Sequence, residues 1–294
     1  MKFGYVILHY KNIIDTEKCI ESILNTADPS SVVVVVDNGS NDGSGEMLKV
    51  KYDQCHVLVS AENEGFSKGN NRGYKYLREN YDVDFIIVTN NDVVFYQQDF
   101  ERNIEKIYAR TGFDLLGPDV YIPNNNEHQN PIFLEGITIG ELEKELSEYR
   151  YYKENPEKFE KRLKMHFIKN KLCSNVPPVR WLYSKVRGTD NIDYRKEYTN
   201  VGLQGSCLIV SSKYIEEEEK MFAPEPFLYC EEVLLYYKCI DKGYKIVYNP
   251  ELGIRHEEAA SFKNANKNSL DRLNFMLKHH VAARELLLEY LKNR

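Results

Sequence analysis

Five consecutive valines, Val32–Val36, restrict the fold of this chain more than any other stretch. β-Branched residues favour strands, and an apolar run without alternation is typical of a strand buried on both faces, as in a parallel sheet. Three further apolar runs, Phe3–Leu8, His56–Val59 and Phe85–Val88, are separated from it by loops and helix-like segments. Strands that alternate with helices predict a doubly wound α/β fold.

Polar loops follow two of these predicted strands. Asp37 opens a glycine-rich loop after the valine run, and Asn90-Asn91-Asp92 follows Phe85–Val88. In sheets of this kind, ligands bind outside the carboxyl ends of the strands. Asp37 and Asp92 are therefore expected at one edge of the sheet.

Asp92 lies between two apolar runs, because Val93-Val94-Phe95 follows it directly. A buried carboxylate is costly without a partner, and divalent metals take Asp and Asn oxygens as ligands. The alternative is that Asp92 caps a turn, because Asn-Asn-Asp also suits turns. Both interpretations fit this stretch alone.

The segment 63–73 joins the third and fourth predicted strands and contains three glycines, Lys68 and Arg72. A glycine-bearing loop at a helix start with cations nearby suits an anion. It is not a P-loop, since G-x-x-x-x-G-K-[ST] is absent. An ordinary loop before a helix is the alternative.

Bulk composition excludes several classes. The net charge of −6 argues against general nucleic-acid binding. The six cysteines include no C-x-x-C pair, which favours free thiols in a reducing cytoplasm. The N-terminus does not have the pattern of a signal peptide, and no apolar run approaches the roughly 20 residues of a membrane span.

The α/β rhythm stops between Pro118 and about Asn200. Glu141–Tyr152 is predicted to be helical, and Lys161–Arg187 contains eight Lys or Arg and no Asp or Glu. A basic segment with interleaved apolar residues can lie on an anionic membrane surface. A solvated basic helix packed on the main domain is the alternative.

Two adjacent acids, Glu231 and Glu232, enter an otherwise apolar and aromatic helical segment. Buried carboxylates have raised pKa values and make usable general bases, although acids at a helix start also favour the helix dipole. Both explanations can hold. The acidic run Glu216–Glu219 is expected to be a solvated helix face. His256 follows the last predicted strand, and a single histidine is more often structural than a ligand.

Taken in order, these blocks resemble the inverting glycosyltransferases of family 2, which have the GT-A fold: a Rossmann-like, mixed and mainly parallel sheet flanked by helices. The resemblance covers residues 3–120 and 200–258 and extends to the rhamnosyltransferase-like branch of bacterial polysaccharide enzymes. It rests on Val36–Ser44 (V-D-N-x-S-x-D-G-S), Asn63–Asn71 (N-x-G-F-x-x-G-N-N), Asn90–Asp92 (in place of D-x-D), Gly205–Cys207, Glu231–Glu232 and His256.

The resemblance implies a role for each block. Glu232 would be the general base beside Glu231, Gly205 and Ser206 would face the sugar and acceptor, and Asp92 with His256 would hold Mn²⁺ or Mg²⁺. The implied nucleotide-binding residues are His9, Tyr10, Asp37, Asn38, Asn63, Gly65, Lys68, Asn70, Asn90 and Asn91.

The chain departs from the family pattern at several positions. Asn90 replaces the first acid of D-x-D, which lowers the negative charge of the metal site. Glu232 replaces the usual Asp, and Leu234 stands where many relatives have a second Asp. The pair Arg180-Trp181 does not form the Q-x-x-R-W signature of processive polymerases. We therefore expect a single addition of sugar.

The predicted activity is transfer of a sugar from a UDP- or dTDP-sugar to a glycan or lipid-linked acceptor, in surface polysaccharide biosynthesis. The predicted location is cytoplasmic, with peripheral membrane contact through residues 161–187. We expect a catalytic domain at 1–258, with a helical basic insertion at about 123–200, and a helical extension at 259–294. A non-catalytic nucleotide-sugar or glycan-binding module is one alternative. A sugar-nucleotide pyrophosphorylase is the other, but residues 8–16 lack the glycines of its early loop.

Overall fold

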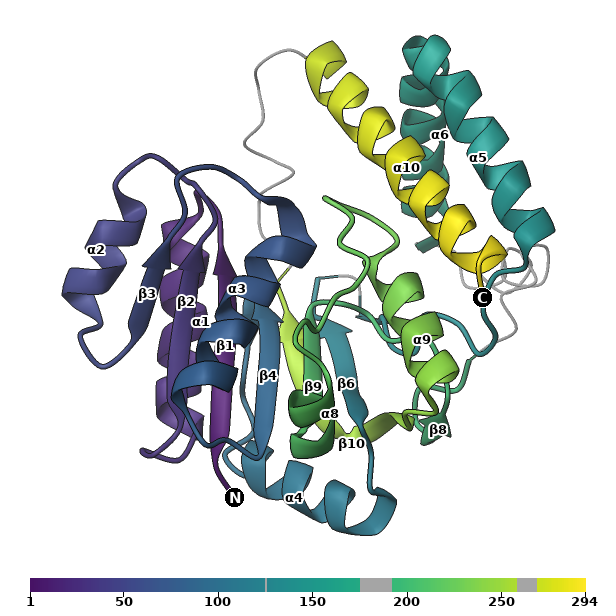
Figure 1. Ribbon diagram of the computed structural model, residues 1–294. Coiled ribbons are helices and arrows are strands. Elements are labelled where there is room, and N and C mark those ends of the chain that lie inside the picture. The colour runs from purple at the N-terminus through teal and green to yellow at the C-terminus, as the bar shows by residue number, and fades with distance from the viewer. Residues whose placement is uncertain (125, 175–191, 258–268) are drawn as a thin grey trace. The chain divides into compact units, whose positions relative to one another are not determined.

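The computed structural model describes residues 1–124, 126–174, 192–257 and 269–294 (Figure 1). Strands in these ranges form one ten-stranded sheet of order β3-β2-β1-β4-β9-β6-β10-β5, with β7 beside β6 and β8 beside β10. The strands are β1 Phe3–His9, β2 Val32–Asp37, β3 His56–Val59, β4 Phe85–Asn90, β5 Val93–Val94, β6 Leu115–Ile122, β7 Glu127–His128, β8 Tyr198–Thr199, β9 Cys207–Ser211 and β10 Ile246–His256. The helices are α1 Ile13–Thr26, α2 Ser44–Lys51, α3 Gly65–Asn80, α4 Phe100–Thr111, α5 Ile139–Glu154, α6 Pro156–Ser174, α8 Ser212–Glu217, α9 Glu231–Lys242 and α10 Ser269–Lys292.

The sheet is mixed and mainly parallel, which confirms the predicted fold class. Strands β3, β2, β1 and β4 are mutually parallel. Strand β9 runs antiparallel to both of its neighbours, β4 and β6, and β10 runs parallel to β6. The four parallel strands therefore end at one common edge.

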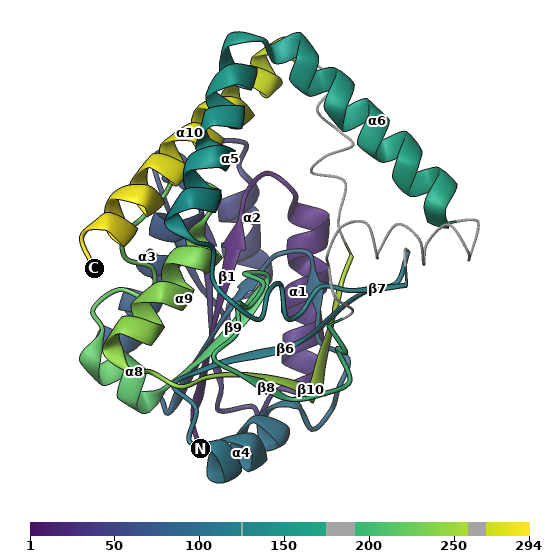
Figure 2. The same cartoon turned by 90° about the vertical axis from the view of Figure 1, so that its right-hand side faces the viewer.

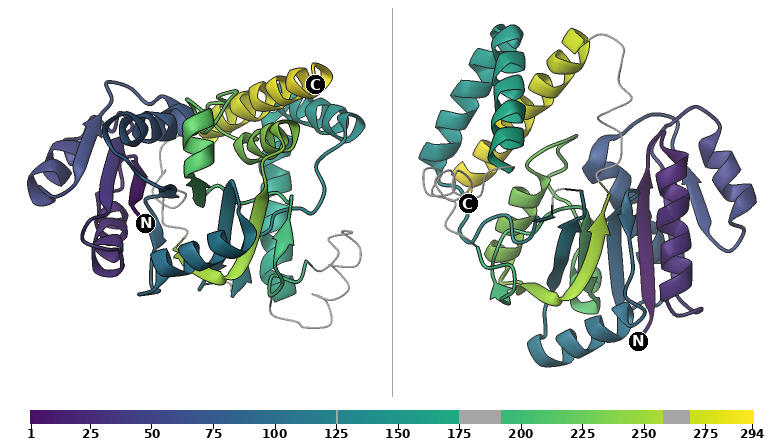
Figure 3. Two further views of the ribbon diagram at one scale, coloured as in Figure 1. Left: turned by 60° about the horizontal axis from the view of Figure 1, so that its bottom comes forward. Right: turned by 180° about the vertical axis from the view of Figure 1, so that it is seen from behind.

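The valine strand is buried on both faces, as predicted. Val33 and Val35 belong to the core on the side of α1, α2 and α4, whereas Val34 and Val36 belong to the core on the side of α3, α8 and α9. Helix α3 lies in front of the sheet in Figure 1, and α1 lies in front of it in the rear view of Figure 3. Burial on both sides fixes the strand's register and with it the position of Asp37.

Two local predictions differ from the structure. The strand expected at 244–248 is the longer β10, which continues to His256 through a register shift between Asn249 and Gly253. The acidic run 216–219 is not wholly solvated, because Glu218 is buried and pairs with Lys238 at 2.9 Å. An ion pair between distant segments leaves no periodic signal in the sequence.

The chain divides into two compact units, Met1–Gly136 with Tyr194–Ala265 and Arg294, and Ile137–Asp193 with Asn266–Asn293. Helices α5, α6 and α10 make up the second unit, where α5 and α10 lie side by side (Figure 2). Phe159 of α6 packs against Leu273 and Leu277 of α10 in a small apolar core. An ion pair of 3.0 Å between Arg284 Nε and Glu145 Oε2 also joins α10 to α5.

The predicted domain boundaries, at about 123–200 and 259–294, stay predictions. Residues 161–174 of the basic segment Lys161–Arg187 belong to α6, whereas residues 175–187, with the Arg180-Trp181 pair, lie outside the described residues. None of the helices in the described part of the chain combines the length and the apolarity needed to cross a membrane.

Candidate active site

The ends of several strands bring distant residues to one edge of the sheet. His9 at the end of β1 pairs with Asp37 at the end of β2, and Leu8 pairs with Asn90 at the end of β4. Ser206 directly precedes the antiparallel strand β9, and its carbonyl oxygen accepts a hydrogen bond of 2.9 Å from the Asn90 N–H. The loops after β1, β2 and β4 therefore leave the sheet next to the start of β9.

His9 is fully buried, and both of its ring nitrogens have partners within the protein. Nδ1 lies 2.7 Å from Thr16 Oγ1 of α1, and Nε2 lies 2.8 Å from Ser44 Oγ of α2. Burial lowers the pKa of His9, although the Asp37 carboxylate opposes this effect. The His9 side chain thus binds the first turns of α1 and α2 to the end of β1. The neighbouring Tyr10 is 41% exposed and therefore accessible to a ligand.

Asp37 ends β2 with a carboxylate that is almost wholly buried. Its Oδ1 accepts a hydrogen bond of 3.0 Å from the Ser40 N–H. Its Oδ2 lies against Gly45, where an added Cβ would come within 2.3 Å of that oxygen. The loop after β2 therefore holds the Asp37 carboxylate in one orientation, and a glycine at position 45 leaves room for it.

Asn38 joins the two motifs that are predicted to bind nucleotide, Val36–Ser44 and Asn63–Asn71. Its Nδ2 donates to the Gly65 carbonyl oxygen at 3.0 Å and to Asn63 Oδ1 at 3.2 Å, and its Oδ1 accepts from the Glu64 N–H at 3.0 Å. Asn63 Oδ1 also accepts from the Gly65 N–H at 2.9 Å. The loops after β2 and β3 are therefore one connected structure, and a ligand at this edge would meet both.

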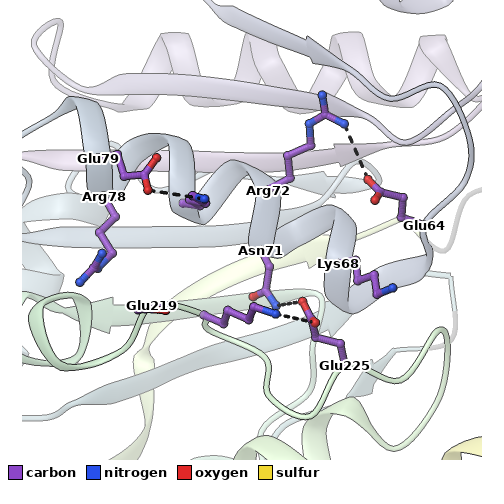
Figure 4. Close-up of a pocket in the computed structure, with 10 residues that line it drawn as sticks. Glu64, Lys68, Asn71, Arg72, Arg78, Glu79, Glu219 and Glu225 are labelled. Carbon is purple, nitrogen blue, oxygen red and sulfur yellow. Dashed lines mark hydrogen bonds and ion pairs between the residues drawn. The ribbon is translucent and has the colours of Figure 1, made fainter.

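Lys68 and Asn70, both predicted to bind nucleotide, have different surroundings on α3. Lys68 lines a cavity of about 590 Å³ (Figure 4). The cavity carries charges of both signs, from Lys68, Arg72, Lys75, Arg78, Lys220, Glu64, Glu79, Glu219 and Glu225. Asn70 is 1% exposed, and neither polar atom of its side chain has a partner within the described part of the chain. An unpaired buried amide costs about 1–3 kcal/mol, so Asn70 is suited to bind a water or a ligand atom.

The Asn90-Asn91-Asp92 segment turns its side chains in different directions. Asn91 Nδ2 donates to the Asn12 carbonyl oxygen at 3.3 Å and to Thr16 Oγ1 at 2.9 Å, so this side chain anchors the segment to α1. Asp92 turns instead toward β10, and its carbonyl oxygen accepts a hydrogen bond of 2.9 Å from the Glu257 N–H. The backbone thereby presents the Asp92 carboxylate to the end of β10.

Asp92 and His256 meet as predicted for a shared metal, with Asp92 Oδ1 3.2 Å from His256 Nε2. His256 Nδ1 lies 3.0 Å from Gln129 Oε1. Because an amide oxygen only accepts, the Nδ1–H of His256 donates to Gln129, which leaves Nε2 facing Asp92. Two electron-rich atoms facing each other call for a cation or a proton between them.

The donor atoms fit a hard divalent cation that also binds substrate. Asp92 Oδ1 is buried without a hydrogen-bond partner among the described residues. The same part of the chain contains no group of three or more His, Cys, Asp and Glu side chains arranged as a metal site. Mg²⁺ is commonly held by one or two carboxylates together with substrate phosphates, and Mn²⁺ takes similar ligands. Asp92 and His256 could supply the protein's share of such a site.

Glu231 and Glu232 occupy the first turn of α9. Desolvation raises the pKa of both carboxyls, and the negative charge of Glu232 raises that of Glu231 further. The backbone N–H groups of Glu232 and Gly205 oppose the shift of Glu232. The pair thus lies at a helix start, with Glu231 buried and Glu232 half-buried, which is compatible with both explanations given by the sequence.

Gly205 and Ser206 place the carboxylate pair beside the strand ends. A Cβ added to Gly205 would lie 3.1 Å from Glu232 Oε1 and 3.4 Å from Phe66 Cζ of α3. Ser206 Oγ and Glu231 Oε2 are both buried without a hydrogen-bond partner in the described ranges. The edge between β4, β9 and α9 thus collects polar atoms that have no hydrogen-bond partner among the described residues.

Comparison with protein families confirms the resemblance. The model of glycosyl transferase family 2 matches residues 6–180, which is more than half of the chain. The protein therefore belongs to glycosyl transferase family 2. Glu231, Glu232 and His256 lie beyond the matched residues, so their roles depend on the geometry described above.

Curated relatives match over a shorter stretch. The low-salt glycan biosynthesis hexosyltransferase Agl10 of Haloferax volcanii is 28% identical over 116 residues, 39% of this chain and 35% of its own length. The glycosyltransferase AglE of the same organism is 30% identical over 120 residues, 39% of this chain and 38% of its own length. The chain thus matches little more than a third of either relative.

A solved structure shares the fold. TarS 1–349 from S. aureus superposes on 97% of this chain and 70% of its own, with a TM-score of 0.51 and 13% sequence identity. At that identity the likeness establishes the GT-A fold and nothing about substrate.

The structure adds residues that the sequence analysis did not single out. Gln129 fixes the hydrogen of the His256 ring, and Asn71 bonds the loop that leads to Glu231. Asn71 lay within a motif that was recognised, but Gln129 lay in a segment without one. A partner that only orients another side chain gives no composition or spacing signal.

Proposed function

We propose that this protein is an inverting glycosyltransferase that adds a single sugar from a UDP- or dTDP-sugar to a hydroxyl of a glycan or lipid-linked acceptor. The observation that carries the proposal is the position of Glu232. Its carboxylate is desolvated and lies against Gly205, beside the ends of β4 and β9. A base at this place can reach an acceptor hydroxyl next to a donor bound along the strand ends.

The donor's nucleoside lies along the loops after β1, β2 and β3 in this proposal. Asp37 and Asn38 are held rigidly there, and Tyr10 offers an exposed ring for stacking. The diphosphate continues toward Asn90-Asn91-Asp92. A Mg²⁺ or Mn²⁺ ion bound by Asp92 and His256 would neutralise charge on the leaving diphosphate.

Glu232 removes the proton of the acceptor hydroxyl in the proposed reaction. The acceptor oxygen forms a bond to the anomeric carbon while the bond from that carbon to the diphosphate oxygen breaks. Attack from the face opposite the diphosphate inverts the configuration in one displacement. Burial and the charge of Glu232 raise the pKa of Glu231, and a proton held on Glu231 would leave the negative charge of the pair on Glu232, the base.

Replacement of Glu232 by Gln tests this assignment. Loss of a general base lowers kcat about 10²–10⁴-fold, while UDP affinity, measured by calorimetry, should stay within threefold. Glu216→Gln is the matched control, because Glu216 is an exposed carboxylate on α8. Wild-type turnover in Glu232→Gln would refute the role of Glu232.

The proposed biological context is the synthesis of a surface polysaccharide. Agl10 is by its name a hexosyltransferase of glycan biosynthesis, which supports a glycan acceptor. The resemblance to rhamnosyltransferase-like enzymes supports dTDP-rhamnose as a donor beside the UDP-hexoses. A wild-type protein that binds UDP or dTDP but never turns over a sugar nucleotide would favour a binding module instead. Asn90, Glu232 and Leu234 are the substitutions that raise this alternative.

A further inference from the structure

The loop from Glu218 to Cys230 connects the two parts of the proposed site. It follows α8 and leads directly into Glu231 and Glu232 at the start of α9. Along its length it lies against α3, the helix that begins in the nucleotide-side motif. Figure 4 shows Asn71 of α3 pointing toward Glu225 of this loop.

Asn71 bonds the loop backbone in both directions. Its Nδ2 donates to the Phe222 carbonyl oxygen at 2.7 Å, and its Oδ1 accepts from the Phe222 N–H at 2.9 Å. Nδ2 also donates to Glu225 Oε1 at 2.9 Å, and Lys220 Nζ pairs with the same carboxylate at 2.8 Å. Asn71 is 6% exposed, so these bonds are shielded from water.

The first turn of α3 holds the loop at a second point. The Phe66 N–H donates to the Phe227 carbonyl oxygen at 2.7 Å, and the Phe66 ring meets the Phe222 ring edge-on at a centroid distance of 5.4 Å. The same Phe66 ring reaches Gly205, next to Glu232. Helix α3, the loop and the carboxylate pair are therefore in continuous contact.

Few residues separate these contacts from Glu231. Leu228, Tyr229 and Cys230 fill the gap, and the last two adopt left-handed backbone conformations with φ of 71° and 61°. Such conformations cost energy for residues other than glycine and persist where the surroundings enforce them. A displacement of Phe227 would therefore be passed on to the start of α9.

We propose that Asn71 is a positioning residue that holds the loop, and through it Glu232, against the nucleotide-binding helix. The proposal rests on the function proposed above, because it assigns Asn71 to the placement of the general base. It also implies that nucleotide bound at α3 orders the carboxylate pair. Asn71 itself has no part in binding the donor.

The test is Asn71→Ala, examined by hydrogen exchange and by steady-state kinetics. We expect peptides covering residues 222–234 to exchange about tenfold faster, while those covering α1 and α4 are unchanged. We expect kcat to fall about 10–100-fold, because small misplacements of a catalytic group are that costly. KM for the sugar nucleotide should change less than threefold.

The pH profile separates positioning from a loss of folded protein. Release of the loop admits water to Glu232, and relief of desolvation lowers the raised pKa of its carboxyl. The acidic limb of kcat should therefore move to lower pH in Asn71→Ala. Ile107→Val, a core substitution on α4, and Lys75→Ala, which lines the same cavity, are controls in which that limb should not move.

A reversal of donor and acceptor tests the hydrogen bond between Asn71 and Glu225. Asn71→Asp places two carboxylates side by side, whereas Asn71→Asp with Glu225→Gln restores one hydrogen bond with donor and acceptor reversed. We expect the double variant to recover part of the protection of residues 222–234 that Asn71→Asp loses. Absence of any recovery would contradict a holding role for the bond between Asn71 and Glu225.

The two proposals fail in different ways. Wild-type protein that neither binds UDP nor turns over a sugar nucleotide refutes the proposed function, yet the exchange of residues 222–234 still reports on Asn71. Asn71→Ala with wild-type exchange, kcat and pH profile refutes the positioning role, even when the wild-type enzyme is active.

Discussion

At the scale of single residues, the buried Glu231 lies beside the proposed general base and lowers the stability of the fold. The residue is 8% exposed, and its Oε2 has no hydrogen-bond partner within the described ranges. A group with a pKa raised in the folded state reduces stability as pH rises from the unfolded value of 4.5 through the folded value. Below about pH 4 both states are protonated, and the cost vanishes.

Glu231→Gln should therefore stabilise the protein at pH 8 and leave it unchanged at pH 4. A pKa raised from 4.5 to about 8 costs up to about 5 kcal/mol of stability, at about 1.4 kcal/mol per pH unit, and chemical unfolding at the two pH values would measure this cost. Glu216→Gln, on an exposed carboxylate, should show no such pH-dependent gain. Equal stability of Glu231→Gln and wild type at pH 8 would mean that Glu231 is not held protonated.

Some features of the candidate site could be predicted from the sequence, and others could not. The meeting of Asp92 and His256 was predicted, because both belong to motifs and strand ends bring them together. The burial of both His9 nitrogens was not predictable, since it depends on Thr16 and Ser44 from two other elements. Motifs identify residue types, whereas side-chain orientation is decided by packing.

At the scale of elements, the start of α3 depends on Gly65. Its φ is +83°, and an added Cβ would lie 2.4 Å from the Phe227 carbonyl oxygen. Gly112, at the end of α4, has a φ of +59° and nothing within 4 Å of an added Cβ. Substitution of Gly112 therefore measures the free-energy cost of the left-handed backbone alone, whereas substitution of Gly65 adds the cost of a steric clash with the loop.

Gly112→Ala should cost about 1–2 kcal/mol of stability, from the left-handed conformation alone. Gly65→Ala should cost about 1–3 kcal/mol more, because the loop must also move away from α3. Chemical unfolding of both variants measures the difference. An equal loss of stability in the two variants would show that the loop 218–230 moves away from α3 without a measurable cost.

The first four strands could be predicted from the sequence. The wrong predictions, for Glu218 and for the ends of β10, have a common cause, because both depend on contacts with distant segments. Apolar runs identified β1, β2 and β4 because burial on both faces removes polar residues from them, whereas β3 is a half-exposed edge strand that its apolar run alone identified. Glu218 was misassigned because its partners, Lys238 and Lys242, come from another helix. The ends of β10 were missed for a similar reason, since its bulge and its pairing with β5 are set by the sheet.

At the scale of the whole molecule, the basic segment 161–187 is the region that we predict to contact an anionic membrane surface. Replacement of Lys164, Lys169 and Lys171 by Glu should weaken binding to vesicles that contain anionic lipid, because each cation near such a surface contributes about 1 kcal/mol. Co-sedimentation with anionic and neutral vesicles measures this. Binding that is unchanged by the three substitutions would remove the membrane contact from the account.

A thermal-shift comparison of UDP and dTDP, each with and without Mn²⁺, on wild type and Asp92→Asn tests the proposed nucleotide-sugar site. Ligand at 100 times its Kd stabilises the folded state by about 2.7 kcal/mol. We predict a shift with one nucleotide that grows with Mn²⁺ in wild type and does not grow in Asp92→Asn. A shift independent of metal in wild type, or no shift with either nucleotide, would contradict a nucleotide-sugar site built around Asp92 and His256.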